Sequence, residues 1–347
     1  MKIGSSQIGL NQKPFIIAEM SGNHNQSLER ALEIVEAAAK TGAHALKLQT
    51  YTANTMTLDV SEGEFFINDE ESLWKGESLY ELYEKAHTPW EWHEPIIQQA
   101  KELGMICFST PFDDTAVDFL EDLNIPAYKI ASFEITHLPL IKKVASTGKP
   151  MIISTGMASV AEMDEMVQTI RDAGCEQFVL LKCTSTYPAT PENSNVLTIP
   201  HMRKLFNCEV GLSDHTLGIG ASMSAIAHGA TIIEKHFTLN RADGGVDSAF
   251  SMEPEEMKQL VIETERAWQS LGKVTYGPTE TEKGSHKFRR SLYIAEDMKK
   301  GEILNENNLR IVRPGLGLSP KHYDIVLGRK VKKDVKKGSS VSWELIK

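Results

Sequence analysis

The chain has 347 residues, of which 41% are hydrophobic and 24% are charged, and its formal net charge is −10. This composition is typical of a globular protein with one large and one small domain, and no apolar run approaches the ~20 residues of a membrane span. The four cysteines form no C-x-x-C pair and residues 1–12 lack the layout of a secretion signal. We therefore expect free thiols and a cytoplasmic location.

The charge is distributed unevenly along the chain. From Ser285 onward there are 15 basic and 7 acidic residues, whereas the preceding part carries 22 basic and 40 acidic residues. A basic tail can bind nucleic acid, but here the lysines are not interleaved with aromatic residues as a stacking surface requires. We expect no nucleic-acid partner and interpret the asymmetry as attraction between the two parts, within or between subunits.

The first part of the chain repeats one pattern, in which a short apolar strand is followed by polar residues and an amphipathic helix. Residues 15–19 form the first expected strand, and Ser27 is expected to cap a helix that ends at Gly42. In the second strand, Lys47 and Gln49 alternate with apolar residues, so both are expected on one face.

A long acidic excursion over residues 52–75 has no clear periodicity. Because long loops in compact domains are usually functional, we expect it to lie over an active site. The strand and helix pattern then resumes with a helix from Pro89 to Gly104. Further strands are expected at 105–110, 127–132, 151–156, 178–183, 210–212 and 231–233, and helices from 114, near 138, and over 160–173, 219–228 and 254–271.

Eight apolar strands, nearly all followed by a helix, predict a closed (β/α)8 TIM barrel over residues 1–272, with the active site at the C-terminal ends of the strands. An open doubly wound sheet is disfavoured because no G-x-G-x-x-G follows the first strand. Residues 273–289 are expected to be a linker. Residues 290–347 are expected to be a small β-rich domain with a weak repeat that begins at Asp297 and Asp334. Such a small domain buries little apolar surface alone, so it should lean on a barrel.

Polar side chains at the strand ends are expected to gather at one mouth of this barrel. Lysines and hydroxyls together suit a phosphate or carboxylate, and two neutral imidazoles suit a divalent metal. For single residues, the alternatives are core histidines, solvent-exposed lysines and helix-capping hydroxyls. The residues of this constellation are Glu19, Lys47, Gln49, Thr110, Lys129, Ser132, Ser154, Ser185, Ser213, His215 and His236.

Three further carboxylates lie near the histidines in the sequence. We expect Asp214 and Glu234 on the strand face opposite the histidines, with structural roles. Glu19 then remains the only inward carboxylate at a strand end and the best candidate to position or deprotonate a water. Asp247 follows the last strand, where a turn aspartate and a ligand-binding residue are equally expected.

These motifs resemble those of the sialic-acid synthases over nearly the whole length of the chain. The tail resembles the antifreeze-like (SAF) domain that ends these enzymes, and the N-terminal motifs are most similar to the branch that makes pseudaminic acid. The segments that carry the resemblance are IAEMSGNHN (17–25), KLQT (47–50), STPF (109–112), KIAS (129–132), ISTGM (153–157), CTSTYP (183–188), GLSDH (211–215), EKHFTL (234–239), and in the tail RSL (290–292), KGE (300–302) and RPGLG (313–317).

The resemblance implies an enzyme that joins phosphoenolpyruvate to a diacetamido-trideoxy-altrose and releases phosphate by C–O cleavage. A legionaminic-acid precursor or N-acetylmannosamine is the alternative sugar. The resemblance also implies that His215 and His236 hold a divalent metal, for which Mn²⁺ is the first expectation and Mg²⁺ and Co²⁺ are alternatives. The substrates would be bound by Lys47, Gln49, Thr110, Phe112, Lys129, Ser132, Glu134, Ser154, Ser185, Tyr187, Ser213 and Asp247.

The resemblance also implies a domain-swapped homodimer in which Arg313 reaches the neighbouring barrel and binds an acetamido group of the sugar. Two other classes of function are disfavoured. A metal-dependent barrel hydrolase would carry an H-x-H pair on its first strand, and an ice-binding protein would show a flat Thr/Ala face where this tail is rich in lysine.

Overall fold

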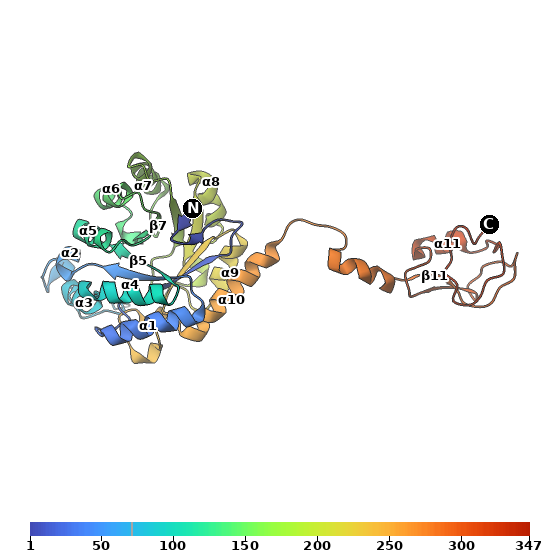
Figure 1. Ribbon diagram of the computed structural model, residues 1–347, viewed down its shortest axis with the longest axis horizontal. Helices are drawn as coiled ribbons and strands as arrows, with labels where there is room; N and C mark the ends of the chain where they lie inside the picture. The colour runs from blue at the N-terminus through green and yellow to red at the C-terminus, as the bar shows by residue number, and fades with distance from the viewer. Residues whose placement is uncertain (71) are drawn as a thin grey trace. The chain divides into compact units, whose positions relative to one another are not determined.

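The computed structural model describes residues 1–70 and 72–347, which form two compact units, Met1–Gly272 and Lys273–Lys347. The first unit, whose helices are labelled in Figure 1, is built around a closed barrel of eight parallel strands. The spatial order of the strands is β10-β3-β4-β5-β6-β7-β8-β9. The predicted (β/α)8 barrel is therefore confirmed. The strands are β3 (Phe15–Glu19), β4 (Ala45–Thr50), β5 (Ile106–Pro111), β6 (Tyr128–Ile130), β7 (Met151–Ser154), β8 (Phe178–Cys183), β9 (Glu209–Ser213) and β10 (Ile232–His236).

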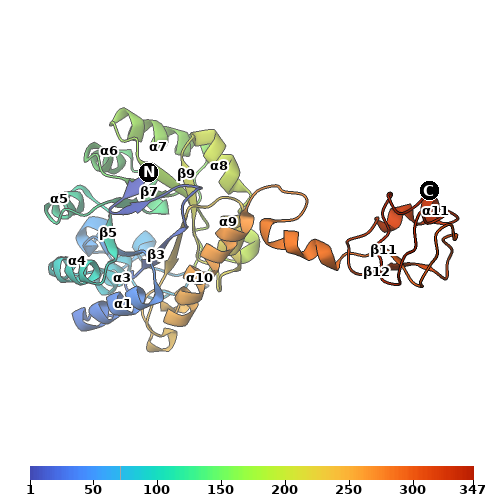
Figure 2. The ribbon, with the colours of Figure 1, turned by 45° about the vertical axis from the view of Figure 1, so that its right-hand side comes forward.

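Helices surround the barrel and bury their apolar faces against it (Figure 2). The predicted ends of α1 are confirmed, since Ser27 accepts a hydrogen bond from the Arg30 N–H and Gly42 ends the helix at φ 85°. None of the helices in the described residues is long and apolar enough to cross a membrane. The surrounding helices are α1 (Leu28–Thr41), α4 (His93–Glu102), α5 (Asp114–Asp122), α6 (Leu138–Ser146), α7 (Val160–Asp172), α8 (Thr198–Phe206), α9 (Gly220–Ala227) and α10 (Pro254–Leu271).

The barrel interior changes from apolar to polar along its axis. Inward side chains near the strand starts, such as Phe15, Phe108 and Ile232, form an apolar cluster. The hairpin of β1 (Lys2–Ile3) and β2 (Ser6–Gln7) adds Ile3 to this cluster. Because side chains on a strand alternate between faces, the next inward position of each strand lies two residues further on, closer to the C-terminal mouth. The inward positions nearest that mouth, such as Glu19, Lys47 and Glu234, carry the polar side chains of the predicted site.

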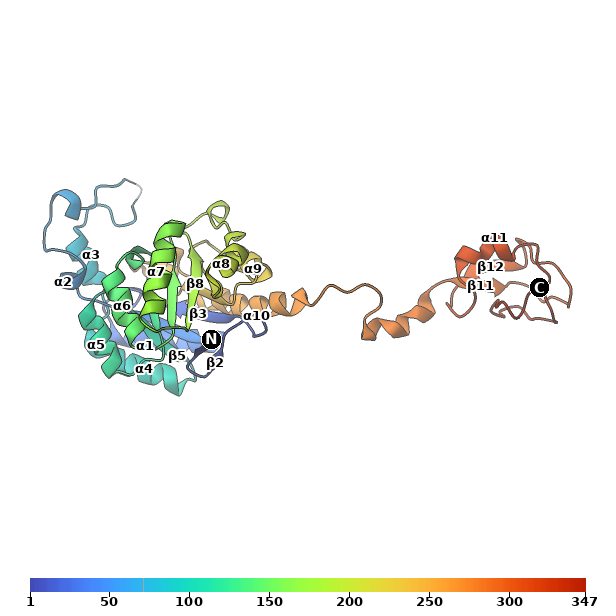
Figure 3. The same cartoon turned by 90° about the horizontal axis from the view of Figure 1, so that it is seen from above.

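The excursion after β4 leaves the barrel and returns beside it (Figure 3). It contains the short helix α2 (Ala53–Met56) and the helix α3 (Leu79–Ala86), which the sequence analysis did not assign. Between them, the Ile67 N–H donates to the Glu77 carbonyl at 3.0 Å and the Gly76 N–H donates to the Ile67 carbonyl at 2.9 Å. Position 71, which belongs to the predicted loop, lies outside the described residues.

The second unit contains the antiparallel strands β11 (Ser291–Ile294) and β12 (Leu309–Val312), the short helix α11 (Tyr323–Val326) and a separate apolar core. The two copies of its sequence repeat pair with each other. Met298 and Val335 exchange backbone hydrogen bonds of 2.9 Å in both directions. Asp334 binds Lys299 at 2.8 Å, and Asp297 binds Lys336 at 2.7 Å. The two copies of the repeat are therefore joined by matching backbone hydrogen bonds and ion pairs.

Candidate functional site

A cavity of about 580 Å³ lies at the C-terminal ends of the barrel strands. This volume falls within the usual range for small-molecule sites. Its walls come from the strand ends, from the excursion and from the loop after β10. The predicted residues that line it are Lys47, Gln49, Phe112, Lys129, Ser132, Glu134, Ser154, Ser185, Tyr187, Ser213, His215, His236 and Asp247.

Three predicted residues are not in the cavity wall. Glu19 and Thr110 are fully buried and contact Lys47, which reaches the cavity. They therefore belong to the layer that supports the cavity wall. Arg313 directly follows β12 in the second unit and is exposed there. Its role in a neighbouring barrel stays a prediction.

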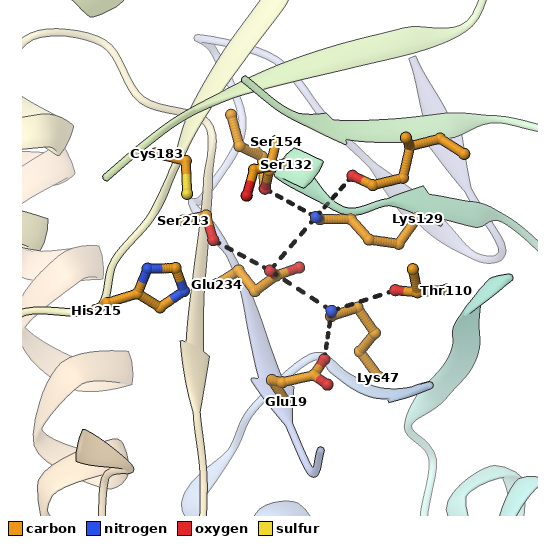
Figure 4. Close-up of polar contacts among 12 residues, drawn as sticks. Glu19, Lys47, Thr110, Lys129, Ser132, Ser154, Cys183, Ser213, His215 and Glu234 are labelled. Carbon is orange, nitrogen blue, oxygen red and sulfur yellow. Dashed lines mark hydrogen bonds and ion pairs between the residues drawn. The ribbon is translucent and has the colours of Figure 1, made fainter. Parts of the chain in front are cut away.

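Four buried charges alternate in sign along one side of the cavity (Figure 4). The Lys47 ammonium lies 2.5 Å from a Glu19 carboxylate oxygen and 3.7 Å from Oε1 of Glu234. The same Glu234 oxygen is 3.7 Å from the Lys129 ammonium and accepts a 3.2 Å hydrogen bond from the Ser213 hydroxyl. We call Glu19, Lys47, Glu234 and Lys129 the charge chain. With all four groups ionised, it carries no net charge.

The two carboxylates of the charge chain hold protons differently. Burial raises the pKa of Glu19 to about 7, because only Lys47 lies close enough to oppose much of the cost of burying its charge. Burial also acts on Glu234, but Lys129 and Lys47 outweigh it and lower the pKa of this carboxyl. A proton entering the chain therefore resides on Glu19, and Glu234 stays ionised between the two lysines.

The prediction that Glu234 points away from the histidine face is wrong. Residues two apart on a strand share a face, so Ile232, Glu234 and His236 all point into the barrel. The residue between them, Lys235, points outward and pairs with Asp214 at 3.1 Å. Asp214 therefore lies on the outer face as expected, but Glu19 is not the only inward carboxylate. The two-residue spacing in the sequence was sufficient to identify Glu234.

Hydroxyl groups lie next to Lys129 and form a cradle with it. The Lys129 ammonium donates to the Ser154 hydroxyl at 2.8 Å, and the hydroxyls of Ser132 and Ser185 lie 2.8 Å apart. Gly156 allows these side chains to converge, since a Cβ at this position would lie 2.5 Å from the Ser132 Cβ and its φ is +46°. An ammonium surrounded by hydroxyl donors is suited to a phosphate or carboxylate.

The two predicted metal ligands lie next to each other at the cavity, edge to face, with ring centroids 5.4 Å apart. The Nδ1 of His215 lies 2.9 Å from the Thr184 carbonyl and donates to it, so Nε2 is the ring nitrogen that remains for other partners. The Nδ1 of His236 is buried without a hydrogen-bond partner, and burial and the nearby His215 and Lys47 lower its pKa far below the usual value. Burial acts to lower the pKa of His215, but its interactions with Cys183 outweigh burial and raise it. Two imidazoles side by side at one cavity fit a borderline divalent ion such as Mn²⁺.

Further metal ligands must come from outside this pair. Within residues 1–70 and 72–347, no group of three or more His, Cys, Asp or Glu side chains is arranged to hold a metal ion. The nearest carboxylate, Asp247, has one oxygen 3.7 Å from the Nδ1 of His236. A metal ion held by the two histidines would therefore need further ligands, which substrate oxygens or water could supply.

Asp247 is held in place by contacts between three loops. The Ser21 hydroxyl donates to its carboxylate, and the Trp74 indole N–H donates to the Val246 carbonyl at 3.0 Å. Burial raises the pKa of Asp247, although the Ser21 hydrogen bond opposes this shift. The aspartate is thus a positioned cavity group, which sequence alone could not distinguish from a turn residue.

Sequence comparisons relate the chain to known proteins over most of its length. Residues 34–276 match the NeuB family, and residues 289–347 match the SAF domain. The chain is 42% identical to a pseudaminic acid synthase of Campylobacter jejuni over 98% of each protein. It is 43% identical to the pseudaminic acid synthase of Helicobacter pylori over 95% of this chain and 97% of that protein.

The fold resembles that of a solved relative. An N-acetylneuraminic acid synthetase from Leptospira borgpetersenii, crystallised with citrate, superimposes with a TM-score of 0.74 at 30% identity, over 82% of this chain and 94% of the other.

Proposed function

Because the chain belongs to the NeuB family, we propose that it catalyses the pseudaminic acid synthase reaction. In this reaction phosphoenolpyruvate, a diacetamido-trideoxy-altrose and water give the nine-carbon acid and inorganic phosphate. The relatives of 42% and 43% identity that carry this name support the choice of sugar. The observation that carries the reaction type is that one cavity combines a buried lysine-hydroxyl cradle with two adjacent imidazoles.

Phosphoenolpyruvate would occupy the cradle of Lys129, Ser132, Ser154, Ser185 and Ser213. Burial lowers the pKa of Lys129, but the nearby Glu234 opposes this shift. The charged lysine would therefore attract an incoming anion in a low-dielectric site, where electrostatic interactions are stronger than in water. Lys47 and Gln49, on the adjacent strand β4, would hold the carboxylate end and orient the methylene carbon.

The sugar would bind on the other side, between the histidines and Asp247. A divalent ion held by His215 and His236 would supply Lewis-acid polarisation of the sugar's aldehyde group. Tyr187 lies against His215, with ring centroids 4.5 Å apart, and walls off one side of this region. Asp247 would accept a hydrogen bond from a sugar hydroxyl.

The reaction forms one C–C bond and one C–O bond, the latter to the oxygen of water, and breaks the C–O bond to phosphate. The methylene carbon of phosphoenolpyruvate would attack the aldehyde carbon, whose oxygen takes up a proton. Water would add to the resulting oxocarbenium carbon and lose a proton, and phosphate would then leave with its C–O bonding electrons as the new hydroxyl loses its proton to give the keto group. Glu19 would take the proton of this water through Lys47, since the Glu19–Lys47 ion pair links the buried carboxylate to the cavity.

The active form is proposed to be a domain-swapped homodimer. The exposed Arg313 of the second unit would enter the barrel of a second copy and bind an acetamido group of the sugar. The basic composition of this unit and the acidic composition of the barrel favour such docking.

Phosphate release from phosphoenolpyruvate tests the proposal. The assay compares the altrose-type sugar, its manno-configured counterpart and N-acetylmannosamine, each with Mn²⁺ and with a chelator. We expect release with the altrose-type sugar and Mn²⁺, and loss of release with the chelator. Preference for a manno-configured sugar would support the proposed reaction type but refute the altrose-type sugar as the substrate. Full activity in the presence of the chelator would refute the proposed metal requirement. Absence of phosphate release with all three sugars would refute the proposed function.

A further inference from the structure

The cavity has an apolar side that the proposed chemistry does not use. Met56, Ile67, Leu79 and Tyr83 line it, and all four side chains are only half-buried. We call these residues the apolar wall. They all come from the excursion after β4 and from α3. The excursion also adds Asp69 and Ser72 to the lining, but the lysines and histidines of the site come from the strand ends and the loops that follow them.

The apolar wall is attached to the barrel at several points. The Trp74 indole ties the excursion to Val246, next to the sugar-side Asp247. The Gln26 side-chain amide donates to the carbonyls of Lys85 and His87 at 3.0 and 2.7 Å, which secures the end of α3. The wall is therefore built into the cavity before a ligand arrives, and preorganisation of this kind reduces the entropy cost of binding.

A partly exposed apolar wall gains stability when apolar ligand atoms cover it, at roughly 25 cal/mol for each Å² removed from water. Phosphoenolpyruvate has no such atoms to offer, since its two ends are anionic. The sugar does have them. A diacetamido-trideoxy sugar carries a terminal methyl group and two acetamido methyl groups, whereas N-acetylmannosamine has a terminal hydroxymethyl group and one acetamido group.

We propose that the apolar wall is the element that selects the sugar, by receiving the methyl groups of a deoxygenated, doubly N-acylated chain. This inference rests on the proposed function and adds to it the residues that set the substrate class. A hydroxymethyl group against this wall would lose hydrogen bonds to water without replacement. A difference of one such group between two sugars should change kcat/KM by about 10- to 200-fold when the group lies in an apolar pocket.

The test replaces wall residues by polar residues of similar size, Leu79→Asn and Ile67→Asn, in the full-length enzyme. The control is Leu58→Asn, since Leu58 lies on the same excursion, is 64% exposed and does not line the cavity. We expect each wall variant to lower kcat/KM for the altrose-type sugar about tenfold or more and to reduce its preference over N-acetylmannosamine. The KM for phosphoenolpyruvate should stay unchanged, which also shows that the barrel is folded.

Each outcome has a separate meaning. If the wild-type enzyme uses the altrose-type sugar but the wall variants match Leu58→Asn, the apolar wall does not select the sugar. An equal fall for both sugars also refutes the inference, and so does a wild-type preference for N-acetylmannosamine. If the wild-type enzyme fails to release phosphate with any of the sugars, the proposed function is refuted, and the inference that rests on it is refuted too. Where one wall variant does not fold, the other decides the result.

Discussion

Replacement of Glu19 by glutamine tests whether the charge chain takes part in proton transfer. Glu19 is fully buried, and burial raises the pKa of its carboxyl to about 7. The carboxylate is the form that accepts a proton. Its share is ~10% at pH 6, ~50% at pH 7 and ~90% at pH 8. We therefore expect kcat to rise through pH 7 in the wild-type enzyme, because activity is lost as the pH falls and Glu19 becomes protonated.

The expected effect of Glu19→Gln is large. Positioned general bases contribute about 10²- to 10⁴-fold, so kcat at pH 8 should fall by at least about 100-fold, and the rise through pH 7 should disappear. Lys47 does not titrate in this window. Burial lowers its pKa, but Glu19 and Glu234 outweigh that effect, so the net pKa is raised. The assay is phosphate release at saturating substrates between pH 6 and 9.

A second group in the cavity requires a control. Interactions with His215 outweigh the cost of burial and lower the pKa of the Cys183 thiol to about 7. Cys183→Ser should keep the rise through pH 7, whatever its absolute rate. If Glu19→Gln retains the rise, or keeps more than a tenth of kcat at pH 8, Glu19 is not the base. If only Cys183→Ser removes the rise, the thiol is responsible.

Two other perturbations address the sugar side. Ser21→Ala removes the hydroxyl that donates to Asp247 and should raise the KM for the sugar about five- to tenfold, with KM for phosphoenolpyruvate unchanged; equal changes in both would indicate a general structural effect. Arg313→Ala should raise the KM for the sugar about tenfold. A mixture of the Arg313→Ala and Glu19→Gln variants should recover activity after subunit exchange. A swapped heterodimer would contain one site in which both Glu19 and the partner's Arg313 are present, so the absence of recovery would refute the domain swap.

The barrel could be predicted from the sequence because most of its strands end before a recognisable helix signal. Ser27, Gly42 and the apolar spacing between them define α1 with little dependence on tertiary contacts. The helix α8 was missed because Pro200 lies inside its sequence. In the structure this proline occupies the first turn, where its missing N–H has no intrahelical partner to lose. Local signals thus determined most of the fold.

The apolar wall could not be predicted in this way. Ile67 and Leu79 are separated by irregular chain, and they face the cavity because the excursion folds back through hydrogen bonds between Ile67 and Glu77. No period of two or 3.6 residues connects these positions. The polar residues of the site were accessible because they lie at the ends of regular strands, where alternation determines the face of each side chain.

Glu234 explains how two buried lysines remain charged before a substrate arrives. At an effective dielectric constant near 20, a charge pair at 3.7 Å contributes about 4.5 kcal/mol, so Glu234 opposes the cost of burying Lys47 and Lys129 by a similar amount each. An uncompensated buried ammonium would instead lose its proton. The arriving phosphoenolpyruvate then adds negative charge to a chain that is neutral rather than strongly positive. Strong binding of the ground state is thereby limited, and the same lysines stay available for the charge that develops on the departing phosphate.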